Sequence, residues 1–218
     1  MHHLLEQERS DAPDSWGCIS VESKPYPMPV IYYIRHGQTD WNAQGRLQGG
    51  QDVPINALGE QQARRAGHIL ADLLARDGRD AQALSFVSSP LGRARTTMEL
   101  VRGKLRLPSE GYAVDDRLRE ISFGDMEGSM RESDPALFAA RLANNWNDPP
   151  PNGESYAAVA ARVADWYGQV NTDTVAVAHG GTAWALMIAL GLVKPGSVVT
   201  VDQGVVYVFG PDGLARYS

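Results

Sequence analysis

The fold of this chain is decided by the stretch Ile31–Tyr32–Tyr33–Ile34–Arg35–His36–Gly37–Gln38–Thr39–Asp40–Trp41–Asn42. Its first four residues are β-branched or aromatic, which is typical of a strand, and the run stops abruptly at Arg-His-Gly. In open α/β sheets, ligands bind at the carboxyl ends of strands. An arginine and a histidine at such an end, followed by a glycine that allows close backbone approach, therefore indicate an anion site.

Two later segments repeat this arrangement. A short apolar run at 83–87 leads through Ser89 and Pro90, which fit the start of a helix, to Arg93 in the first helical turns. Arg95 lies about 200° further round that helix, so we expect it to face solvent. The buried-type strand at 174–178 ends on His179.

The carboxyl ends of parallel strands lie at one edge of a sheet, so these side chains can converge. Two arginines and two histidines around one point suit a dianionic phosphate better than a carboxylate or a metal. The histidines have no spaced carboxylate or thiolate companions, and the arginines would repel a divalent cation. We therefore expect no metal and no other cofactor.

Strands that alternate with helices predict an α/β protein, a three-layer α/β/α sandwich with a mostly parallel sheet and an inserted lid. Further helices are expected at 57–76, behind the cap Asn56, from Ser155 onward, and at 183–190, and further strands at 112–114 and at 205–209, the last closing the sheet. The predicted lid spans about 125–155 and contains a helix at 134–147. Residues 1–28 are expected to be a flexible N-terminal extension, and residues 29–218 a single domain.

The bulk composition excludes several classes of protein. At 218 residues with 43% hydrophobic residues, the chain can bury a substantial core. A net charge of -6 argues against binding to nucleic acid or to an anionic membrane surface. No run is long enough to span a bilayer, and the single cysteine, Cys18, excludes an internal disulfide. We expect a cytoplasmic protein with a small-molecule partner, and the sequence leaves a homodimer open.

A neutral imidazole in a phosphate pocket can attack phosphorus in line, while arginines stabilise the charge on the equatorial oxygens. The leaving alkoxide then needs a proton. A carboxylic acid beside a dianionic phosphate holds its proton more strongly, so a nearby Glu or Asp could donate it and later activate water. Taken alone, Glu120 reads as a solvated member of an acidic loop.

Seven blocks of sequence, in order from about Val30 to Phe209, resemble the histidine phosphatase superfamily, also called phosphoglycerate-mutase-like. They are Arg35–Thr39 with Asn42; Leu47–Pro54; Gly59 with Gln62–Ala63; Ser88–Ala94; Leu118–Glu120 with Phe123–Gly124 and Glu127–Gly128; Gly153–Ser155; and His179–Gly181. The chain departs from the family at Ile55–Asn56, where Leu-Thr or Leu-Ser is usual, and this change leaves the chemistry untouched.

The resemblance implies roles for individual residues. His36 would be the phosphorylated nucleophile and Glu120 the proton donor. The phosphoryl group would be bound by Arg35, Arg93 and His179 with help from Asn42 and Gln48, and Gly49 and Gly180 join the substrate-binding set. Glu154, in the Gly-Glu-Ser block, would be structural or lid-positioning rather than catalytic.

The reaction is a choice between hydrolysis and transfer. Cofactor-dependent mutases of the family carry a longer insertion with a paired-arginine block, and the segment between Glu120 and His179 has no adjacent arginines. We therefore expect a metal-independent phosphomonoester hydrolase of a small phosphorylated metabolite, acting through a phosphohistidine. A phosphoglycerate mutase and a non-catalytic phospholigand-binding regulatory module are the alternatives. The substrate depends on the lid and is not revealed by the sequence.

Overall fold

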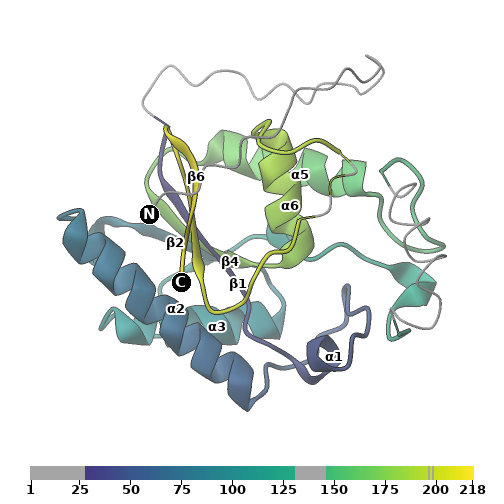
Figure 1. Cartoon of the computed structure of the whole chain (residues 1–218), viewed down its shortest axis with the longest axis horizontal. Helices are drawn as coiled ribbons and strands as arrows, with labels where there is room; N and C mark the ends of the chain where they lie inside the picture. Colours follow the sequence, from purple (N-terminus) through teal and green to yellow (C-terminus); the bar gives the residue numbers. More distant parts are fainter. Residues whose placement is uncertain (1–27, 131–145, 196, 198) are drawn as a thin grey trace.

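The computed structural model describes residues 28–130, 146–195, 197 and 199–218 (Figure 1). Within these residues, six strands form one sheet in the order β3-β2-β4-β1-β5-β6. The strands are β1 (Ile31–Arg35), β2 (Ser85–Ser88), β3 (Ala113–Val114), β4 (Thr174–Ala178), β5 (Val206–Gly210) and β6 (Gly213–Tyr217). The predicted N-terminal extension up to residue 27, and residues 134–145 of the predicted lid helix, lie outside the described residues.

The four strands on the β3 side of the sheet run parallel, and the two on the β6 side are antiparallel to their neighbours. β4 pairs in parallel with both β1 and β2, whereas β5 pairs antiparallel with β1 and with β6. The mostly parallel sheet of the sequence prediction is therefore confirmed.

Helices cover both faces of the sheet. α2 (Ala57–Arg76) and α3 (Gly92–Lys104) lie on one side, and α5 (Tyr156–Gln169) and α6 (Gly180–Ala189) on the other (Figure 1). The described part of the chain also contains the short helix α1 (Asp40–Ala43) and three 3-10 turns, η1 (Ala81–Ala83), η2 (Asp116–Leu118) and η3 (Gly124–Met126). This is the predicted three-layer α/β/α sandwich.

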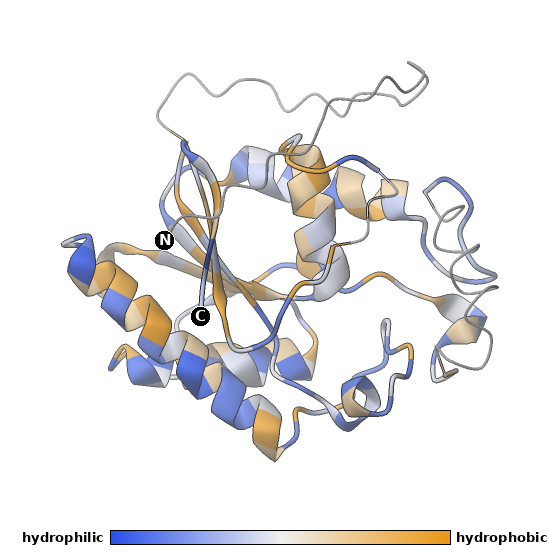
Figure 2. Cartoon of the chain, in the orientation of Figure 1, coloured by the Kyte–Doolittle hydropathy of each residue, from blue (hydrophilic) through white to orange (hydrophobic). Residues whose placement is uncertain are grey.

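The alternation of side chains along β1 explains why two helical layers are needed. Ile31 and Tyr33 pack into the core under α5 and α6, whereas Tyr32 and Ile34 pack into the core under α2 and α3. Successive residues of a strand point to opposite faces, so a strand that is apolar throughout must be covered on both. A helix that covers one face of the sheet needs apolar residues on the side toward the sheet and polar residues on the side toward solvent. Figure 2 shows that α2 carries residues of both kinds along its length.

Two details of the sequence prediction are wrong. The segment Val206–Gly210 does not close the sheet, because a turn at Gly210–Gly213 returns the chain as β6 on its outer edge. Ser89 and Pro90 do not begin α3, which starts at Gly92, where Asp52 Oδ1 accepts the backbone N–H at 2.8 Å. An acceptor from a distant loop thus replaces the expected local cap.

The register of the central strands brings the decisive residues together. Arg35 of β1 lies opposite Ala178 of β4, and the N–H of His36 donates to Ala178 O at 2.9 Å. The next residue of β4 is His179, so the two histidines leave neighbouring strands at the same edge. On the other side of β4, Ser89 N donates to Val177 O at 3.0 Å and follows β2 directly.

Candidate active site

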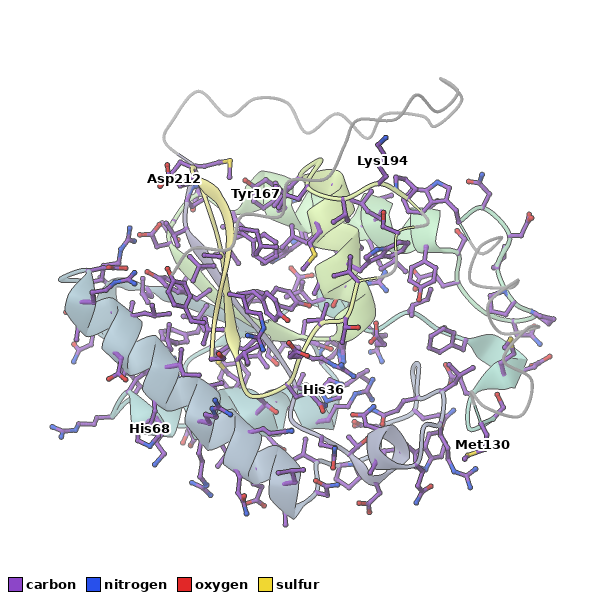
Figure 3. All side chains as sticks on the ribbon, viewed as in Figure 1. His36, His68, Met130, Tyr167, Lys194 and Asp212 are labelled. Carbon is purple, nitrogen blue, oxygen red and sulfur yellow. The ribbon has the colours of Figure 1, made fainter. Side chains whose placement is uncertain are left out.

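His36 lies in the interior, just beyond the end of β1 (Figure 3). Its side chain is buried, and its Nδ1 lies 2.7 Å from Gly37 O. A carbonyl oxygen can only accept, so Nδ1 carries the proton and Nε2 keeps its lone pair. An imidazole in this state can act as a nucleophile through Nε2.

The second histidine lies beside the first. The ring centroids of His36 and His179 are 5.1 Å apart, and His179 has no exposed surface. Burial lowers the pKa of both imidazoles well below 6.5, and the charges of Arg93 and Arg35 lower it further. Both rings are therefore neutral at pH 7, the state in which an imidazole nitrogen keeps a free lone pair.

These two pKa shifts predict an acid-sensitive stability. Below pH 6.5 the unfolded chain binds protons at both histidines and the folded chain does not, so the free energy of unfolding falls as pH falls. The loss approaches about 1.4 kcal/mol per pH unit for each histidine. Urea unfolding between about pH 5.5 and 8 measures it.

Acidic side chains also make the free energy of unfolding depend on pH, and two variants separate their contribution from that of the buried histidines. In His36→Gln, the slope of the free energy of unfolding against pH should decrease by the contribution of one bound proton. His68→Gln, which changes an exposed histidine of α2 (Figure 3), should keep the wild-type slope. A wild-type stability that does not decline below pH 6.5 would contradict the burial argument.

The two arginines reach the site from different elements. Arg35, at the end of β1, donates from Nη1 to Val201 O at 2.7 Å. Arg93, in the first turn of α3, donates from Nη2 to Gly49 O at 2.8 Å and from Nη1 to Gln51 O at 2.5 Å. Burial lowers the pKa of Arg93 to about 10, so its guanidinium is still charged at pH 7.

The loop whose carbonyls hold Arg93 favours glycine at position 49. Gly49 has φ +53, and a Cβ there would lie 2.2 Å from Glu127 Oε1. Glu127 in turn accepts the N–H of Gly50 at 2.8 Å and the N–H of Phe123 at 3.1 Å. Glu127 therefore ties the glycine loop to the segment that follows Glu120, a role that sequence reasoning did not predict.

The two predicted amide ligands occupy the loop after β1. Gln48 is buried, and its Oε1 accepts the Thr39 hydroxyl at 2.5 Å. Asn42 Oδ1 accepts from the Thr39 N–H at 3.3 Å and from Gln203 Nε2 at 3.1 Å. Because its oxygen is engaged, Asn42 presents an NH₂ group, which suits a phosphoryl oxygen.

Gln203 is a residue that sequence reasoning missed. Its Nε2 donates to His36 O at 3.1 Å as well as to Asn42, so one side chain joins the end of β1 to the loop after it. It lies 167 residues along the chain from His36, in a loop with no recognisable motif. No sequence pattern could have found it.

Glu120 lies beside the start of α6. Its Oε2 accepts the Gly181 N–H at 3.3 Å and its Oε1 accepts its neighbour's N–H, that of Ile121, at 3.0 Å. A Cβ on Gly181 would lie 2.4 Å from Glu120 Oε1, so this carboxylate can approach only a glycine. The neighbouring Gly180 faces Arg35, whose Nε would lie 3.6 Å from a Cβ there.

Glu154 forms an ion pair with Arg162 that helps to hold the segment carrying Glu120. Arg162 of α5 donates to both carboxylate oxygens of Glu154, at 2.7 and 2.9 Å, and to Arg117 O at 2.5 Å. The backbone N–H of Glu154 also donates to Ser122 O at 2.9 Å. These hydrogen bonds fix the backbone on both sides of Glu120, at Arg117 and at Ser122, to α5 and to the segment just before it.

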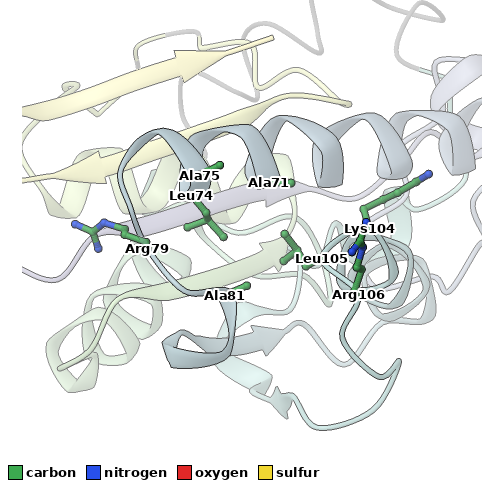
Figure 4. Close-up of a pocket in the computed structure, with 8 residues that line it drawn as sticks. All are labelled: Ala71, Leu74, Ala75, Arg79, Ala81, Lys104, Leu105 and Arg106. Atoms are coloured by element: carbon green, nitrogen blue, oxygen red, sulfur yellow. The ribbon is translucent and has the colours of Figure 1, made fainter.

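Other candidates lie apart. Arg95 is exposed, with its Nε 3.4 Å from Tyr112 Oη. A pocket between the C-terminal ends of α2 and α3 has apolar and basic lining residues (Figure 4); it is lined by Ala71, Leu74, Ala75, Arg79, Ala81, Lys104, Leu105 and Arg106. It lies at the opposite end of α3 from Arg93.

Within the described ranges, no three His, Cys, Asp or Glu side chains gather as a metal site, and no helix is long and apolar enough to cross a membrane.

Comparisons with known proteins show which proteins this chain resembles in sequence and fold. The model of the histidine phosphatase superfamily (branch 1) matches residues 31–209. A glucosyl-3-phosphoglycerate phosphatase of Mycolicibacterium vanbaalenii is 38% identical over 73% of this chain and 73% of its own length. A 2,3-bisphosphoglycerate-dependent phosphoglycerate mutase of Azorhizobium caulinodans is 29% identical over 78% and 85%. The crystal structure of a phosphoglycerate mutase from Thermus thermophilus superposes with a TM-score of 0.68, at 32% identity, over 87% of this chain and 98% of that one.

Proposed function

The chain belongs to the histidine phosphatase superfamily, and from this premise we propose that it is a phosphomonoester hydrolase that works through a phosphohistidine at His36. Its relatives are phosphatases and mutases, so the chain is an enzyme of one of these two kinds. The observation that carries the proposal is the hydrogen bond from His36 Nδ1 to Gly37 O, which leaves Nε2 as the attacking atom in a pocket with two arginines.

The first step transfers the phosphoryl group to the protein. Nε2 of His36 attacks phosphorus in line, the bond between phosphorus and the ester oxygen breaks, and Arg35 and Arg93 stabilise the charge on the equatorial oxygens. Glu120, in its acid form, gives its proton to the leaving oxygen. The alcohol then departs.

The second step releases phosphate. The Glu120 carboxylate takes a proton from a water molecule as that water attacks the phosphohistidine, and the bond between phosphorus and Nε2 breaks. The products are inorganic phosphate, His36 with its free Nε2, and Glu120 in the acid form again. His36 thus supplies the nucleophile, Glu120 and water supply the protons, and the arginines stabilise the charge, so no step of the proposed cycle needs a metal.

Hydrolysis is favoured over mutase chemistry by the composition of the segment between Glu120 and His179, which has no adjacent arginines to grip a bisphosphate. We expect phosphate release from a panel of sugar phosphates, phosphoglycerates and nucleotides. We expect no interconversion of 3- and 2-phosphoglycerate when 2,3-bisphosphoglycerate is added. Efficient interconversion with little phosphate release would replace the hydrolase by the mutase.

A chelator tests the metal-independence of the mechanism. Because the arginines already neutralise the phosphoryl charge, dialysis against EDTA should leave the rate of phosphate release within about twofold of its starting value. The control is a second dialysis with added Mg²⁺ or Zn²⁺, which should not raise the rate. Loss of activity with EDTA and its return with a divalent ion would overturn the proposed chemistry.

A further inference from the structure

Tyr33 reaches from β1 to the turn between β4 and α6. Its side chain has no exposed surface, and its hydroxyl donates to His179 O at 2.8 Å and accepts the His179 N–H at 3.1 Å. Its ring stays in the core, edge-on to Phe209, with the ring centroids 6.2 Å apart. One side chain of β1 therefore binds both backbone polar groups of the second histidine.

The sheet itself does not hold the backbone of His179. The ladder between β1 and β4 ends one residue earlier, where the His36 N–H donates to Ala178 O at 2.9 Å. Within the described residues, all other partners of the His179 N–H and carbonyl belong to the first turns of α6: Thr182, which forms a capping box with His179, and Ala183. Tyr33 is thus the partner that joins this turn to another element.

The alternation of side chains along β1 places a second residue beside the same turn. Tyr33 and Arg35 point to one face of the sheet, because residues two apart in a strand share a face. Arg35 lies next to Gly180, where a Cβ would come within 3.6 Å of its Nε, and Tyr33 binds the residue before that glycine. The turn therefore rests on the strand that ends in His36.

We propose that Tyr33 is a positioning residue: its hydroxyl ties His179 to the strand that carries His36, and so sets the two imidazoles relative to each other, at 5.1 Å between their centroids. This inference rests on the proposed function, since the placement of the pair matters only if both rings act on one phosphoryl group. Burial raises the pKa of the Tyr33 hydroxyl, so it keeps its proton and remains a donor at neutral pH. A misplacement of about 1 Å in a site can cost about 10²-fold in rate, so loss of this bond should slow turnover.

The direct test is Tyr33→Phe in the full-length protein, which removes a single oxygen atom and keeps the ring beside Phe209. Both backbone groups of His179 retain a partner in α6, so the variant should fold. We expect kcat to fall roughly tenfold, because the ring of His179 is no longer fixed to β1. KM should stay within about threefold of its wild-type value, because Arg35 and Arg93 still bind the ester.

Two oxyanions separate a positioning role from a loss of stability. Orthovanadate can adopt the trigonal bipyramidal shape of phosphorus under attack, whereas inorganic phosphate stays tetrahedral, so vanadate depends more on the placement of both rings. In Tyr33→Phe, the inhibition constant of vanadate should rise roughly tenfold and that of phosphate by about twofold at most. A general loss of stability would leave the ratio of the two constants unchanged.

The chain supplies a matched control in the neighbouring residue. Tyr32 is also buried, but it packs into the core under α2 and α3, and its hydroxyl interacts with Arg79. Tyr32→Phe therefore removes the same atom from the same strand on the opposite face of the sheet. It should keep kcat and the ratio of the vanadate and phosphate constants within about twofold of the wild type.

The wild type also offers a test that needs no variant. A buried hydroxyl proton that donates to a carbonyl exchanges slowly with water, so the Tyr33 hydroxyl proton should be visible by NMR, with a nuclear Overhauser effect to the His179 amide proton. A Tyr33 hydroxyl proton that exchanges too fast to be seen would overturn the proposal, even if Tyr33→Phe did not fold.

Two results with the variants would contradict the role of Tyr33, and one would contradict the enzyme instead. Equal effects of Tyr33→Phe and Tyr32→Phe on kcat, or an unchanged ratio of the vanadate and phosphate constants in Tyr33→Phe, would mean that Tyr33 serves only packing. Suppose that the wild type releases no phosphate from any monoester, yet prefers vanadate to phosphate and loses this preference only in Tyr33→Phe. The role of Tyr33 would then stand, and the proposed function would fail.

Discussion

His36→Ala is expected to abolish phosphate release, with a loss beyond the ~10²–10⁴-fold that removal of an acid–base group causes. The reason is that Nε2 of His36 forms the covalent intermediate in the proposed mechanism. Arg35 and Arg93 remain to bind phosphate, but binding alone does not divide the reaction into two steps. The variant should therefore still bind inorganic phosphate.

Steady-state phosphate release and labelling by a ³²P-monoester measure this effect. The wild type should carry label after rapid quenching in base, and brief acid treatment should remove it, as expected for a phosphoramidate. His36→Ala should carry none. His68→Ala, on the exposed side of α2, is the control and should match the wild type. Label retained in His36→Ala would place the nucleophile elsewhere.

Glu120→Gln is expected to slow the hydrolysis of alkyl phosphates by roughly 10²–10⁴-fold, because an amide cannot protonate the leaving alkoxide. With p-nitrophenyl phosphate the leaving group needs little help, so the first step should survive. The second step still lacks its base. We therefore expect a burst of about one p-nitrophenol per site, followed by slow turnover and accumulation of phospho-His36.

The matched control is Glu154→Gln, the same chemical change at a residue that helps to hold the segment carrying Glu120. It weakens the ion pair with Arg162 and should lower the rates with alkyl and nitrophenyl esters by similar factors, since it only loosens the segment. A Glu120→Gln enzyme that hydrolyses alkyl phosphates at the wild-type rate would disprove the proton-donor role. Glutamine also leaves one backbone donor, at Ile121 or Gly181, poorly paired, so thermal unfolding should accompany the assay.

Much of the site could be anticipated from local sequence. The strand at 31–35, the strand at 174–178 and the helix after Asn56 follow from apolar runs and from capping, and the structure has them at these positions. The convergence of His36 and His179 follows from a general property of parallel sheets, since their carboxyl ends share an edge. The register Arg35 to Ala178 then brings the two rings within 5.1 Å of each other.

Other features depend on contacts between residues far apart in the sequence. Ser89 and Pro90 carry a local signal for a helix start, but the structure engages Ser89 with His179, and Asp52 caps α3 instead. The strand β6 is largely exposed and forms because it pairs with β5 at an edge. A local preference of about 1 kcal/mol yields readily to tertiary contacts of equal or larger size.

The sequence by itself determined the layers of this protein, the order of its strands along the chain as far as β5, and the residue types that gather at one edge of the sheet. These depend on the period of apolar residues and on strand ends, which are local properties. Only the tertiary structure decided how each group is held: Gln203 against His36, Glu127 under the glycine loop, and Ser89 against His179. Hydrogen bonds reach only about 3 Å, so which distant partners meet is decided once the whole core has packed.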